Sequence, residues 1–156
     1  MTAWLRRGAE LVGAALLAAM FGAFLLQVLM RYVVNQPLEW SLEICLITYV
    51  WFVFWTLAFL MDEREHVAFG LIYQSVAPPV RRIMAMLSAA MIALAFSAAL
   101  PATWDFISFM AIDSTWVLHL RFDLVFFVFL LFMVAAIARA LLRLWRLAGR
   151  GWTTQI

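Results

Sequence analysis

The stretch LVGAALLAAMFGAFLLQVLM, residues 11–30, contains no Asp, Glu, Lys, Arg or His. About 20 apolar residues in a helix are enough to cross the hydrocarbon core of a membrane. Three more uncharged runs follow along the chain, and the two shorter ones reach this length with a few flanking residues. The sequence therefore predicts four transmembrane helices, at approximately 11–30, 40–61, 83–104 and 122–142.

The composition of the whole chain agrees with this prediction. Of the 156 residues, 68% are hydrophobic and 13% are charged, whereas a soluble domain is about half apolar and about a quarter charged. These values exclude a soluble globular enzyme and a disordered chain. Cys45 is the single cysteine, which excludes an internal disulfide framework and a CxxC motif. We expect one all-α integral membrane domain over residues 1–156.

The arginines predict the orientation of this domain. All 11 basic residues are arginines, and with both termini in the cytoplasm only Arg31 and Arg121 lie outside. Because cytoplasmic loops carry an excess of positive charge, this distribution predicts cytoplasmic termini. The arginines flank apolar runs and do not form one basic face, which argues against nucleic acid as a partner. A basic stripe suited to membrane lipids with anionic headgroups is predicted by the helical spacing of Arg139, Arg143, Arg146 and Arg150.

Features that transporters use to bind a solute are missing from the predicted helices. Ionisable residues at membrane depth usually mark an ion or substrate path, and the four uncharged runs contain none. Pro101 and the pair Pro78–Pro79 are expected near helix ends, so no helix is broken at the midplane. A stand-alone multidrug exporter would need an acid in the first helix, where only Glu10 lies at the edge. We expect that the chain does not carry a solute by itself.

The sequence also lacks a catalytic or metal-binding constellation. Glu63 and His66 have the Glu-x-x-His spacing of a carboxylate metal site, but such a site needs more ligands from facing helices. The predicted topology places His119 on the opposite side of the membrane from His66, so the two cannot share a metal. We therefore expect no catalytic residue, metal or cofactor in this chain.

Two loops are rich in polar residues. In the segment 31–43, RYVVNQPLEWSLE, Arg31 ends the first helix, and Glu39 and Glu43 lie one turn apart at the start of the second. We expect an interfacial ion pair in this hairpin, in particular between Arg31 and Glu43. The cluster DEREH, 62–66, follows the second helix, and helical spacing then suggests a short amphipathic helix in the membrane plane. The apolar face of that helix would consist of Phe69, Ile72, Tyr73 and Val76.

The four helices differ in side-chain size. The first and third carry alanine and glycine at a spacing of four residues, as at Ala14, Ala18 and Gly22, which lets helix backbones approach closely in lipid. The second and fourth are rich in Phe, Trp and Tyr. We expect the small-residue helices to pack inside the assembly and the aromatic ones to face lipid or a larger partner.

The two polar loops resemble those of the small membrane subunit of tripartite ATP-independent periplasmic (TRAP) transporters. The likeness rests on RYVVNQPLEWSLE at 31–43, on Trp51, and on REHV at 64–67, and the four-helix layout extends it over the whole chain. Family members show a similar outer hairpin, a Trp in the second helix and an Arg-x-His segment after it. The resemblance implies structural or subunit-interface roles for Arg31, Asn35, Trp40, Glu43, Trp51, Arg64 and His66.

The resemblance implies an accessory role in transport. In such systems a periplasmic binding protein captures the substrate, often an organic acid, and a large membrane subunit imports it with a sodium gradient. The small subunit binds the large one and enlarges its fixed scaffold in the bacterial inner membrane. Sodium coupling is therefore expected in the large subunit. The open alternative is a small four-helix membrane enzyme that uses glutathione, although the uncharged helix interiors argue against its Arg-rich pocket.

Overall fold

The computed structural model describes residues 3–36, 38–61 and 77–149. The elements in chain order are α1 (Ala3–Tyr32), α2 (Glu39–Trp55), the π-helix η1 (Thr56–Leu60), α4 (Pro78–Phe109), the 3-10 helix η2 (Met110–Ile112) and α5 (Phe122–Ala148). With η1 continuing α2 and η2 continuing α4, four helices are long and apolar enough to cross a membrane. This result confirms the all-helical fold with four membrane spans. The predicted in-plane helix falls at residues 69–76, which lie outside the described residues.

Three of the four helices extend beyond their predicted bounds. A charged residue ends an apolar run but does not end a helix: α1 begins before Arg6 and Glu10, which form an ion pair of 3.2 Å one turn apart. Helix α4 begins with Pro78. Proline has no backbone N–H, and a first-turn N–H would have no partner within the helix, so no helical bond is lost there. Pro101 lies inside α4 and not near its end, which corrects the expectation from the sequence. The helix nevertheless continues to Phe109, so its membrane span is not divided at the midplane.

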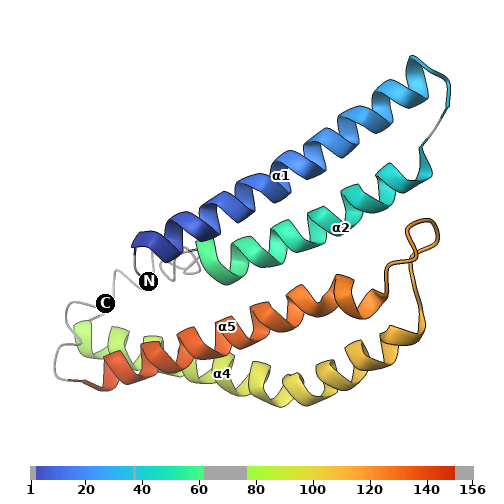
Figure 1. The fold of residues 1–156 in the computed structure, drawn as a ribbon. Helices are drawn as coiled ribbons and strands as arrows, with labels where there is room; N and C mark the ends of the chain where they lie inside the picture. The colour runs from blue at the N-terminus through green and yellow to red at the C-terminus, as the bar shows by residue number, and fades with distance from the viewer. Residues whose placement is uncertain (1–2, 37, 62–76, 150–156) are drawn as a thin grey trace.

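The helices form two antiparallel hairpins, α1 with α2 and α4 with α5 (Figure 1). The hairpins meet through α2 and α5, so the order across the molecule is α1, α2, α5, α4. The sequence predicted that the small-residue helices would pack inside and the aromatic ones outside. Within the chain the opposite holds, because the two aromatic helices, α2 and α5, are central. The rings explain it: Phe54 of α2 lies 5.1 Å from Phe129 of α5 and 5.7 Å from Phe132, measured between ring centroids. Large rings fill the space between the hairpins better than small side chains do.

The small residues are used differently on the two outer helices. On α4, Ala85, Ala89 and Ala93 are buried, in keeping with a close approach of α4 and α5. On α1, Ala14, Ala18 and Gly22 are exposed, and the buried positions are Ala9 and Gly13. A Cβ atom added at Gly13 would lie 3.0 Å from Leu60 Cδ1, so this glycine allows η1 to approach α1 closely.

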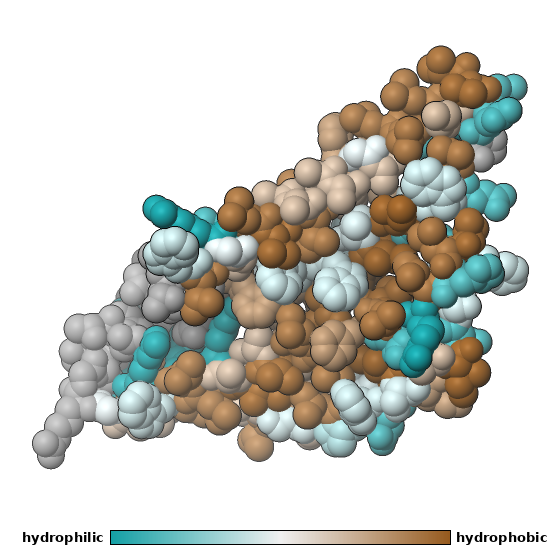
Figure 2. Space-filling model, in the orientation of Figure 1, coloured by the Kyte–Doolittle hydropathy of each residue, from teal (hydrophilic) through white to brown (hydrophobic). Residues whose placement is uncertain are grey.

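The surface of the described residues is apolar over most of its length. Phe24, Leu94 and Trp104 are among many large hydrophobic side chains that are more than half exposed. Figure 2 shows apolar side chains across the middle of this face and hydrophilic ones gathered toward its ends. In water such a surface would drive aggregation, whereas lipid chains solvate it. The distribution is that of a protein embedded in a membrane.

Candidate functional site

The segment that joins α1 to α2, with the helix ends on either side, contains four of the seven positions singled out by sequence. Arg31 lies in the last turn of α1, exposed to the surroundings, with its guanidinium carbon 5.9 Å from the centroid of the Tyr32 ring. Asn35 turns the chain with φ of 57°, a left-handed conformation that Asn tolerates better than most residues. Trp40 lies in the first turn of α2 and is 37% exposed. This end of the molecule therefore presents a cation and an aromatic ring outward.

Glu43 connects this hairpin to the second one. Its two carboxylate oxygens accept hydrogen bonds from the backbone N–H groups of Val117 (2.8 Å) and Leu118 (2.9 Å) in the α4–α5 loop. Within that loop Thr115 N–H donates to the Leu120 carbonyl at 2.9 Å, and Leu120 N–H donates to Thr115 Oγ1 at 3.1 Å. These bonds fix a tight turn that points two adjacent N–H groups at one carboxylate.

The prediction of an ion pair between Arg31 and Glu43 is therefore wrong. Among the described residues the ion pairs are Arg6–Glu10 and Arg121–Asp123, and Arg31 forms neither. Both oxygens of Glu43 already accept hydrogen bonds from backbone N–H groups. The loop holds these N–H groups in place, so bonding them costs no side-chain entropy, unlike bonding an arginine. The favoured partner of the carboxylate is a loop of the other hairpin and not the nearest arginine in the sequence.

Arginines make the corresponding contacts at the opposite ends of the helices. Arg139 of α5 donates from Nη1 to the carbonyl oxygens of Leu57 (3.3 Å) and Met61 (3.2 Å), where η1 ends. Arg82 of α4 donates from Nε to the Leu147 carbonyl at 2.9 Å, in the last turn of α5. The last carbonyls of a helix lack internal partners and carry the negative end of its dipole. Both arginines therefore cap a neighbouring helix, and Arg139 also joins the two hairpins.

Two further polar contacts hold α1 against α2. Ser41 is fully buried, and its hydroxyl contacts the side-chain oxygen of Gln27 on α1. The same Oγ lies 3.0 Å from the carbonyl oxygen of Leu38, and the single hydroxyl proton serves one of these acceptors at a time. Near the other end of this hairpin, Trp55 Nε1 donates to the Ala9 carbonyl at 3.0 Å. The α1–α2 hairpin is thus bonded near both of its ends.

The remaining candidate residues are placed only in part. Trp51 is half-buried in α2, 11 residues after Trp40 and therefore on the same helical face. Arg64 and His66 lie outside the described residues. Sequence reasoning missed the capping role of Arg82 and Arg139, and its signal was available: both arginines lie near an end of an apolar run. It could not have found Val117 and Leu118, because they act through their backbones.

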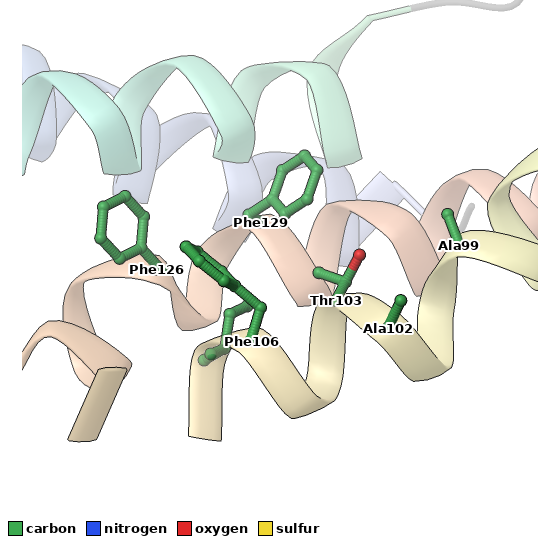
Figure 3. A pocket seen from close by; sticks show the side chains of 7 residues that line it. Ala99, Ala102, Thr103, Phe106, Phe126 and Phe129 are labelled. Atoms are coloured by element: carbon green, nitrogen blue, oxygen red, sulfur yellow. The ribbon is translucent and has the colours of Figure 1, made fainter. Parts of the chain in front are cut away.

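One hollow between the helices has mostly apolar surroundings. It has a volume of about 320 Å³ and lies between α4 and α5. Figure 3 shows Ala99, Ala102, Thr103 and Phe106 of α4 and Phe126 and Phe129 of α5 lining it. Its lining within the described part of the chain includes no ionisable side chain. Among the described residues, no three His, Cys, Asp or Glu side chains come together as metal ligands would. This hollow is suited to packing and not to binding a charged solute.

Residues 20–150 match the model of a protein family described as tripartite ATP-independent periplasmic transporters, DctQ component. The chain belongs to this family. Among curated proteins and among solved structures, no match was found. The matched region begins within α1, at Met20, and covers all of α2, α4 and α5.

The DctQ match confirms the resemblance seen in the sequence. The chain is a small membrane component of a TRAP transporter and a multi-pass membrane protein. The DctQ family comprises transporter components and is not a family of enzymes. This membership gives no support to a glutathione-using enzyme.

Proposed function

We propose that this DctQ-family chain is an accessory scaffold subunit that does not itself carry substrate. In this proposal a large membrane subunit imports an organic acid with a sodium gradient, and a periplasmic binding protein delivers that acid. The observation that carries the proposal is the distribution of charge: within the described membrane spans, residues 11–30, 44–60, 83–104 and 124–138 include no ionisable acid, arginine or histidine. Carriers of anions or of sodium mark their binding sites with ionisable side chains or broken helices at this depth.

The contacts between the hairpins suit a fixed scaffold. Glu43 joins them at the end where α5 begins, and Arg139 joins them where η1 ends. Aromatic contacts such as Phe54 with Phe129 fill the space between these two bonds. Attachment at both ends resists rotation of one hairpin against the other. A large subunit could use such a body as a stationary support for its moving parts.

The proposed contact surface for the large subunit is the face of α2 that carries Trp40 and Trp51. The two residues are three helical turns apart on one face, and Arg31 and Asn35 lie beside the outer end of that face. Aromatic and arginine side chains are frequent anchors of protein interfaces. Large aromatic side chains on a helix face can bury much apolar area against another protein.

Co-purification of the large subunit with tagged variants of this chain tests the proposed surface. We expect Trp40→Ala and Trp51→Ala each to lower recovery of the large subunit severalfold. Trp145→Ala is the matched control, because Trp145 is 76% exposed near the end of α5 and far from this face. Thermal unfolding of each variant shows whether it remains folded. Equal recovery with all three variants would refute this surface.

The proposed location is the bacterial inner membrane, with both termini in the cytoplasm. The start of α1 and the end of α5 lie at the same end of the molecule (Figure 1), as a chain with four spans requires. The arginines capping η1 and α5 lie at this end too, together with Arg6, Arg143 and Arg146. Positive charge gathers on the cytoplasmic side of membrane proteins, which supports this orientation.

A further inference from the structure

An open groove of about 390 Å³ runs along α5, beside α4 and η1. Its lining from Phe96 of α4 and from Phe132 and Ala136 of α5 is apolar. Farther along α5, the lining includes two arginines, Arg139 and Arg143. The groove therefore combines a hydrocarbon-like stretch with a pair of positive charges at one end, and among the residues that the structure describes no acidic side chain lines it.

The position of the arginines along α5 corresponds to the depth of lipid headgroups. With a rise of about 1.5 Å per residue, Arg139 lies about 26 Å and Arg143 about 32 Å along the helix from Phe122. The hydrocarbon core of a bilayer is about 30 Å thick. When the start of α5 lies at one boundary of the core, these two side chains reach the opposite one. Phe132 and Ala136 then lie at the depth of acyl chains.

The arginines retain hydrogen-bond donors for a ligand. The bonds from Arg139 to the Leu57 and Met61 carbonyls both come from Nη1, and a guanidinium has five N–H groups in all. Within the described part of the chain, Nε and Nη2 of Arg139 make no hydrogen bond, and the Arg143 guanidinium makes none either. Because its capping bonds fix the position of the Arg139 guanidinium, its free edge is held in place for an anion.

We propose that this groove binds an anionic phospholipid of the leaflet on the side of the chain termini. The phosphate contacts Arg139 and Arg143, and one acyl chain lies against Phe96, Phe132 and Ala136. Two adjacent positive charges favour a headgroup with a net negative charge over a zwitterionic one, whose ammonium they repel. The apolar stretch distinguishes a lipid from a free phosphate ion. This inference requires only that the chain spans a membrane and does not rest on the transport role.

Native mass spectrometry of the purified full chain tests the proposal, with dioleoylphosphatidylglycerol and dioleoylphosphatidylcholine as probes. These lipids share acyl chains and differ in headgroup charge. We expect tighter binding of phosphatidylglycerol, and Arg143→Gln should weaken it about fivefold, the effect of one basic residue near an anionic lipid surface. Arg146→Gln is the charge-matched control, since Arg146 is exposed and does not line the groove. Equal affinity for both lipids, or equal losses in the two variants, would overturn the proposal.

A second pair of variants tests the acyl-chain part of the groove. Ala136→Phe fills it, whereas Ala138→Phe adds the same side chain on an exposed face of the same turn. We expect Ala136→Phe to reduce phosphatidylglycerol binding at least fivefold and Ala138→Phe to leave it unchanged. If Ala136→Phe instead retains lipid binding but loses the large subunit, the groove is a protein contact and the lipid proposal fails. Arg143→Gln keeps the proposal testable if Ala136→Phe does not fold.

Discussion

Glu43 of α2 accepts a hydrogen bond at 2.8 Å from the backbone N–H of Val117, which lies 74 residues later in the chain. The bond joins the two hairpins of this DctQ-family protein, between the second turn of α2 and the loop that connects α4 to α5. Together with the second bond to Leu118, it makes the position of α2 depend on the shape of the α4–α5 loop. At this end of the molecule, one carboxylate thereby attaches the first helical hairpin to the second.

Replacement of Glu43 should loosen this attachment. Glu43→Ala removes both bonds, and we expect a thermal unfolding midpoint several degrees lower for the detergent-purified chain. Glu43→Gln retains an acceptor oxygen for one N–H and should give an intermediate value. Glu39→Ala is the matched control, because Glu39 is an exposed acid one turn earlier in the same helix. A loss at Glu39 as large as that at Glu43 would contradict the attachment.

Arg31 and Glu43 should act independently. Their charges are opposite and close in sequence, but the carboxylate is bonded to Val117 and Leu118 and not to Arg31. The unfolding midpoints and large-subunit recovery of Arg31→Ala, Glu43→Ala and the double variant form a double-mutant cycle. We expect the two effects to add. A double variant better than the sum of its parts would reveal the ion pair that this structure lacks.

Removal of Arg139 should be among the most harmful single changes at the other end of the molecule. Arg139→Ala leaves the Leu57 and Met61 carbonyls without this donor, and bonds from a charged donor contribute about 1.5–3 kcal/mol each to stability. We expect a clear loss of stability in chemical unfolding in detergent. Arg146→Ala should have little effect, since Arg146 is exposed in the same helix. Similar stability losses in both variants would argue against a specific cap.

Cysteine labelling in intact cells tests the proposed orientation. On a Cys45→Ala background, a membrane-impermeant maleimide should label Gln36→Cys in the outer hairpin but not Ala148→Cys at the end of α5. Both positions are exposed, and they lie at opposite ends of the molecule. After the cells are opened, both should react. Labelling of only Ala148→Cys in intact cells would reverse the proposed topology.

Much of the fold could be predicted because hydropathy alone is enough to locate membrane spans. The run from 11 to 30 predicted α1, and the missed part of α1 contains charged residues that a helix tolerates outside the hydrocarbon core. The packing order was harder to predict. Small residues permit close approach of helices, but the contact between Phe54 and Phe129 shows that aromatic rings form the seam between the hairpins.

The polar contacts were predicted less well, for a physical reason. Glu43 was recognised as a residue needing a partner, yet its partners are backbone N–H groups, which every residue except proline possesses. Their availability depends on the turn made by Thr115 and Leu120, which is a property of tertiary structure. The caps formed by Arg82 and Arg139 likewise depend on which helix ends lie beside them.

The central claim is that this chain supports a transporter without carrying its substrate. The most direct measurement is sodium-driven uptake of a radiolabelled organic acid into proteoliposomes, in the presence of the binding protein that captures that acid. Proteoliposomes containing both membrane subunits should accumulate the acid. Those containing this chain alone should show no uptake above empty liposomes, because its described spans place no ionisable ligand at membrane depth. Sodium-dependent accumulation by this chain alone would contradict the account.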